Sequence, residues 1–146
     1  MKITLKYGID KLLFGMKQTD VISIYGKPNK QYKDEDNNLI FVYNIQKMCL
    51  TFYEDENFRL GYIVSSNTDL ELFEKKIIGK NSEEMNSILS QNKIIKLQFE
   101  DFDTFENYFD EENWITFQAE FDQVTKIEIG ATFTNNDEFD WKFGNS

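Results

Sequence analysis

The feature that most constrains the fold is an amphipathic pattern that recurs about 65 residues further along the chain. Gly15 and Gly79 each open a segment with apolar residues at helical spacing. In the two segments these residues are Val21, Ile24 and Tyr25, and Met85, Ile88 and Leu89. Downstream, the alternating residues 50–52 and 115–117 also correspond. We interpret the pattern as a tandem duplication, with units at 1–66 and 67–146 that share one compact domain.

In the first unit, apolar spacing predicts a short helix near residues 8–14 and a second helix near 17–25. Gly26 and Pro28 end the second helix, because glycine accepts the left-handed cap conformation and proline cannot continue a helix. The apolar and β-branched runs that follow predict strands, separated by polar turns. These strands lie near 39–45, 48–54 and 58–65.

In the second unit, Thr68 and Glu71 match a capping box ahead of a helix, and Asn81 and Glu84 match another. Three strands are expected near 105–110, 114–120 and 123–133, and residues 93–99 could add one more. The tail alternates Phe139, Trp141 and Phe143, which favours a further edge strand. The expected fold class is therefore α+β: two tandem helix-helix-β-sheet units, with an antiparallel sheet and helices on one face.

A short motif adds a resemblance. Gly15-Met16, Val21 and Gly26-Lys27-Pro28 give the pattern G-M-x4-V-x4-G-x-P. It resembles the helical hairpin of the BamE-like outer-membrane-assembly lipoproteins and of the β-lactamase-inhibitor-protein (BLIP) fold. The resemblance implies a tandem, BLIP-like protein whose concave sheet holds another protein. The second unit keeps Gly79 but has no counterpart of the other motif residues, and no lipobox cysteine is present.

The composition argues against catalysis. The chain has no histidine, which excludes Ser-His and Cys-His nucleophile pairs and imidazole metal sites. It also lacks phosphate-binding and dinucleotide motifs, and its acidic clusters do not fit the calcium loop. The single cysteine, Cys49, is expected to be a buried structural thiol in a strand. We therefore expect no enzyme activity, no cofactor and no metal.

Charge is distributed unevenly. Residues 97–146 contain two lysines and 13 acidic residues, a net charge of −11, whereas the whole chain has −10. Negative charge of this density repels nucleic acid and anionic membranes and attracts basic proteins. In the densest stretch, 99–114, acidic residues alternate with aromatic residues. We interpret this stretch as a binding surface; the alternative is a solvated acidic face whose aromatic residues belong to the core. The predicted partner-binding residues of this stretch are Asp101, Phe102, Asp103, Glu106, Tyr108, Asp110, Glu111, Glu112 and Trp114.

These observations predict a non-enzymatic inhibitor, most concretely a bacterial immunity protein that neutralises a cognate basic toxin domain by blocking its cleft. A nuclease is a physically suitable target, because its phosphate-binding cleft is basic. The alternative is a structural or assembly adaptor of the BamE-like kind. No secretion signal or membrane span is visible in the sequence, which predicts a cytoplasmic location.

Overall fold

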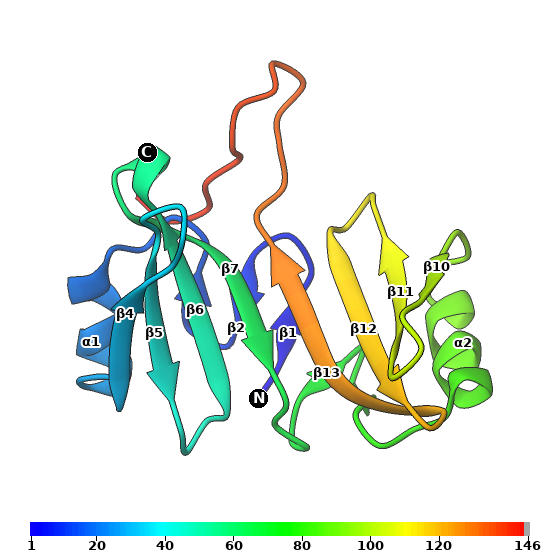
Figure 1. Cartoon of the computed structure of the whole chain (residues 1–146). Coiled ribbons are helices and arrows are strands. Elements are labelled where there is room, and N and C mark those ends of the chain that lie inside the picture. Colours follow the sequence, from blue (N-terminus) through cyan, green and yellow to red (C-terminus); the bar gives the residue numbers. More distant parts are fainter. Residues whose placement is uncertain (145–146) are drawn as a thin grey trace.

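The protein is built on one eight-stranded antiparallel sheet with strand order β10-β11-β12-β13-β7-β6-β5-β4 (Figure 1). A computed structural model describes residues 1–144. In chain order the eight strands are β4 Lys30–Lys33, β5 Leu39–Tyr43, β6 Met48–Tyr53, β7 Arg59–Ser65, β10 Gln98–Asp101, β11 Glu106–Asp110, β12 Ile115–Glu120 and β13 Gln123–Gly130.

Two four-stranded meanders make up this sheet, and they join where β13 pairs with β7 in the register Ile127↔Ser65 to Gly130↔Tyr62. Strand alternation separates the two faces. In β6, Met48, Leu50 and Phe52 are buried, whereas the residues between them are partly exposed. The same alternation in β12 buries Ile115, Phe117 and Ala119. Each meander therefore presents one apolar face to the core.

The buried face is covered by two helices and two small sheets. The helices are α1 Gln18–Tyr25 and α2 Ser82–Gln91. One small sheet contains β1 Ile3–Thr4, β2 Gly8–Ile9 and β3 Leu12–Leu13, and the other contains β8 Glu71–Leu72 and β9 Lys75–Lys76. Leu12, Phe14, Val21, Leu70 and Leu89 from this layer are fully buried in one continuous core with the sheet.

The helix expected near residues 8–14 is wrong: this segment is the hairpin of β2 and β3. Asp10 adopts a positive φ of 51°, which turns the chain. Gly8 has φ of 150°, and a Cβ there would lie 1.9 Å from the carbonyl oxygen of Leu12, so the hairpin needs glycine. The apolar spacing of this short segment fits either a helix or a buried hairpin, and the backbone requirements of the turn decide the outcome.

The helix expected after Thr68 is also wrong. Phe73 and Glu74 have positive φ values of 55° and 65° and form the two-residue turn between β8 and β9. Before β8, the Asn67 side chain stabilises a turn by accepting a hydrogen bond from the amide of Asp69 at 2.9 Å. The expected α+β class of two tandem helix-helix-sheet units is therefore wrong: residues 1–144 are mostly β and contain no such tandem units.

Other elements agree with their predictions. Both α1 and α2 form, and α2 carries the expected capping box, in which Asn81 accepts from the Glu84 amide. Six strands, β5, β6, β7, β11, β12 and β13, lie within a few residues of the predicted ranges. The sequence did not predict β4, and β10 begins five residues after the start of the extra strand expected at 93–99. The tail is not an edge strand: it leaves β13 and crosses toward the first meander, where the amides of Lys142 and Phe143 donate to the Phe14 carbonyl (Figure 1).

Candidate functional site: the open face of the sheet

The acidic aromatic stretch 99–114 forms the β10–β11 hairpin and the turn that leads into β12, and its acids separate into two groups. Asp101 and Asp103 lie at the turn between β10 and β11, where Asp101 accepts from the Asp103 amide at 2.9 Å. Glu111 and Glu112 lie beyond the opposite end of β11, and both are exposed. A five-residue strand separates the groups by roughly 16 Å. They do not form one patch.

The aromatic residues of the stretch divide between both faces and the turn. Phe102 stacks on Phe105 at the turn, with ring centroids 4.8 Å apart, and is 44% exposed. Tyr108 packs on the core side, where burial chiefly raises its pKa, and its hydroxyl donates to Glu106 at 3.3 Å. Trp114 lies on the other side of the sheet against Phe109, at 5.1 Å.

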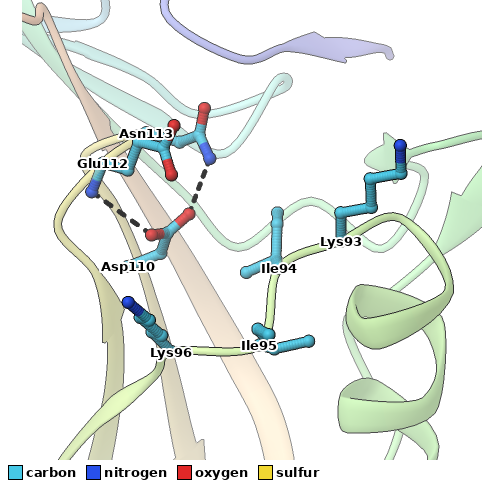
Figure 2. A pocket seen from close by; sticks show the side chains of 7 residues that line it. All are labelled: Lys93, Ile94, Ile95, Lys96, Asp110, Glu112 and Asn113. Carbon is cyan, nitrogen blue, oxygen red and sulfur yellow. Dashed lines mark hydrogen bonds between the residues drawn. The ribbon is translucent and has the colours of Figure 1, made fainter.

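Asp110 has a structural role within the stretch. It is only 6% exposed, and its carboxylate accepts from the Glu112 amide at 3.2 Å and from the Asn113 side chain at 2.7 Å. Figure 2 shows it lining a hollow of about 240 Å³ together with Lys93, Ile94, Ile95 and Lys96 of the linker after α2. Because its carboxylate accepts both hydrogen bonds, Asp110 orders the turn that leads into β12.

The face of the sheet opposite the covering layer, here called the open face, carries a row of aromatic rings. The rings of Trp114 and Tyr62 lie over Gly130: a Cβ added there would be 2.3 Å from Cδ1 of Trp114 and 3.1 Å from Cδ1 of Tyr62. A Cβ added at Gly61 would lie 2.1 Å from Cε2 of Tyr53. Both glycines thus make room for rings that lie close to the strand backbone. We call the row the aromatic belt; its members are Phe109, Trp114, Tyr62, Tyr53 and Phe139.

The belt is held by polar and ring contacts. Tyr62 donates its hydroxyl to Glu128 on β13 at 2.7 Å, and burial, followed by this hydrogen bond, raises the pKa of Tyr62 well above its usual value. Tyr53 lies 5.7 Å from Phe139 of the tail. The belt therefore runs from β11 across both meanders to the tail. Cys49, expected to be buried, is partly exposed on this face.

At the tail end of the belt, two adjoining hollows lie beside acidic residues. They measure about 490 and 430 Å³ and share Asp55, Glu56 and Phe139. One is completed by Phe133, Asp137, Glu138 and Trp141, and the other by Asp36, Asn38 and Tyr53. We call the carboxylates Asp36, Asp55, Glu56, Asp137 and Glu138 the acidic end. Only chain folding brings them together, since they come from three separate segments.

Within residues 1–144, no group of three acidic, cysteine or histidine side chains is arranged to hold a metal ion. No helix in the same range is long and apolar enough to cross a membrane.

Of the nine predicted partner-binding residues, the belt contains only Trp114. The other belt residues and the acidic end were missed, because strand pairing and the returning tail assemble them. One local signal was available: Gly61 lies inside the β7 strand, and an interior strand glycine marks a close approach of another group.

The fold defines the class of protein: a mostly β protein with an open eight-stranded antiparallel sheet. No family model and no curated protein matches the chain. Similar solved structures include an extracellular SCP-domain protein from Bacillus anthracis (TM-score 0.51, 10% identity) and a cysteine-rich secretory protein from Staphylococcus aureus (TM-score 0.50, 14% identity). A DUF4309 family protein, YjgB, from Bacillus subtilis also matches (TM-score 0.47, 11% identity).

Each match covers 80% of this chain. The chain spans 43% and 44% of the first two proteins and 78% of YjgB. At these identities the likeness shows the fold alone. The resemblance to BamE-like and BLIP-like proteins is wrong: the similar structures from Bacillus anthracis and Staphylococcus aureus are of other kinds, and hairpins replace the paired helices which that resemblance implied.

Proposed function

We propose that this chain is a protein-binding module that recognises a basic protein through the open face of its sheet. The observation that carries the proposal is the aromatic belt, whose partly exposed rings lie on the face opposite the covering layer and end beside the acidic end. Aromatic side chains supply much of the binding energy at protein interfaces, because they bury large areas at low entropic cost. Clustered carboxylates attract a basic partner and repel nucleic acid.

In its most specific form the proposal is an immunity protein that inhibits a cognate toxin domain. A nuclease toxin has a basic cleft for phosphate, and a surface of rings flanked by carboxylates is complementary to such a cleft in both polarity and charge. The net charge of −10 supports this choice of partner. In this form, the belt supplies the desolvated anchors and the acids accelerate association.

The cytoplasmic location expected from the sequence stays a prediction. Two of the similar solved structures come from an extracellular protein and a cysteine-rich secretory protein. A secreted location is therefore the alternative for this chain. Fractionation of the native cells with an antibody against the chain would distinguish the two.

The test is direct binding, measured by surface plasmon resonance, to any toxin domain that a gene neighbouring that of this protein encodes. Trp114→Ala and Tyr53→Ala should each weaken binding by about 2 kcal/mol, roughly 30-fold, mainly through faster dissociation. Phe121→Ala is the matched control, because Phe121 is fully exposed in the β12–β13 turn outside the belt. Circular dichroism confirms that each variant folds.

The proposal also predicts that affinity falls as salt rises, because exposed charges are screened. An acidic partner would contradict it. So would belt variants that bind as tightly as the parent protein, since recognition would then use another surface.

A further inference from the structure

We propose that the two adjoining hollows at the tail end of the belt bind an arginine side chain of the basic partner. This inference rests on the proposed function and names the chemical group that the site recognises. It is carried by the aromatic walls of the hollows and by the charge of their rim. The shape, the charge and the absence of a metal-ligand arrangement each narrow the choice of occupant.

The walls contain a stack of three rings contributed by the tail. Phe133 lies 4.5 Å from Phe139 at an interplanar angle of 30°, and Phe139 lies 4.7 Å from Trp141 at 21°. Phe133, at the outer end of the stack, is 51% exposed and so presents a ring face to solvent. A planar guanidinium stacks on such a face more readily than a lysine ammonium does, because it is flat and weakly hydrated.

The rim supplies negative charge without internal neutralisation. The described residues contain two salt bridges, Lys76–Asp69 and Lys142–Asp140, and neither uses a carboxylate of the acidic end. A cation placed between these carboxylates would gain from their combined negative charge.

The carboxylates are too dispersed for a metal ion. No set of three acidic side chains among residues 1–144 has a metal-binding arrangement. The hollows, at about 490 and 430 Å³, are also much larger than an ion needs. A guanidinium fits better, because it has five N–H donors and can bridge separated carboxylates while its plane stacks on a ring.

The experiment uses the full chain and a defined probe, the blocked peptide Gly-Arg-Gly-Arg-Gly. The protein has two tryptophans, so Trp114→Phe leaves Trp141 as the single fluorescent reporter inside the site. Titration should give a saturable change in Trp141 fluorescence. The same peptide with citrulline in place of arginine is isosteric but uncharged, and it should produce no change.

Two pairs of substitutions separate a specific site from general attraction. Glu56→Gln with Asp137→Asn removes two charges from the rim and should weaken peptide binding by about tenfold or more. Glu74→Gln with Glu83→Gln removes the same charge from two exposed residues outside the hollows and should change affinity little. Phe133→Leu keeps every charge and should weaken arginine binding more than lysine binding.

Equal weakening by both charge pairs, or equal binding of the citrulline peptide, would overturn the inference. The outcome is distinguishable from failure of the proposed function. If the protein partner binds through Trp114 and Tyr53 but ignores the Glu56→Gln and Asp137→Asn pair, the arginine site is wrong and the open-face proposal stands. If the peptide binds as expected but the belt variants bind the protein partner as tightly as the parent protein does, the arginine site stands and the open-face proposal is wrong.

Discussion

The substitution Gly130→Ala tests whether the ring of Trp114 packs directly on the backbone of the open face. It lies in β13, and its backbone accepts ordinary L-residues, since its φ is outside the left-handed region. Gly130→Ala would nevertheless place Cβ 2.3 Å from Cδ1 and 2.8 Å from Nε1 of Trp114. Contacts this short cannot persist, so the indole must leave its place over the strand.

Two opposing effects set the magnitude. Overpacking of this kind costs about 1–3 kcal/mol. Replacing glycine by alanine in a compatible backbone restores about 0.4–1 kcal/mol, because the unfolded chain loses conformational freedom. The free energy of unfolding should therefore fall by up to about 2.6 kcal/mol, with about 1.3 kcal/mol at the middle of the two ranges. Each kcal/mol corresponds to roughly 2–4 °C in Tm for a chain of this size.

Urea unfolding followed by circular dichroism measures the loss, and a double-mutant cycle tests its cause. In a Trp114→Ala background the two shortest contacts are gone, and a small ring shift relieves the next one, with Cδ1 of Tyr62 at 3.1 Å. Gly130→Ala should then cost almost nothing, or stabilise the protein slightly. An equal cost in both backgrounds would refute the reasoning, because the indole would not be what excludes a side chain at this position.

Three further outcomes follow from the structure. The pKa of Tyr62 is raised in the folded state, so the contribution of this residue to stability is complete below about pH 10 and declines at higher pH, where Tyr62 ionises in the unfolded chain. In Tyr62→Phe the urea midpoint should therefore fall less steeply with pH above about 10. A midpoint that falls as steeply as in the parent protein would contradict this prediction. Asp110→Asn should cost about 1 kcal/mol or more, since the charged acceptor of the turn amide is lost, and chemical denaturation checks this. Replacing Asp101 and Asp103 by serine should slow association with the basic partner and weaken the dependence of the association rate on salt, while the dissociation rate changes little. Stopped-flow mixing measures these rates. An unchanged association rate at low salt would show that the charges of this turn do not attract the partner.

Local patterns were sufficient where the deciding interactions are close in sequence. The alternation in Met48–Tyr53 and Ile115–Glu120 specifies half-buried strands, and Asn81 with Glu84 specifies the start of α2. The segments 8–14 and 68–77 were not resolved by the same reasoning. Their apolar spacing fits a helix, and only the turns at Asp10 and Phe73 exclude one. Positive φ at such residues depends on the neighbouring strands, so spacing alone could not reveal it.

The sequence by itself determined the strand-rich meanders, the two helices that do form and the strong negative charge of the last third, because these depend on local propensity and composition. The tertiary structure alone decided which surface is a candidate for binding. It divided the acidic stretch 99–114 between two ends of a hairpin, assembled the aromatic belt across β12, β13, β7 and β6, and brought the tail beside Asp55 and Glu56. The physical reason is that these contacts join residues far apart in the chain, and strand register and tail docking arise only when the whole core is formed.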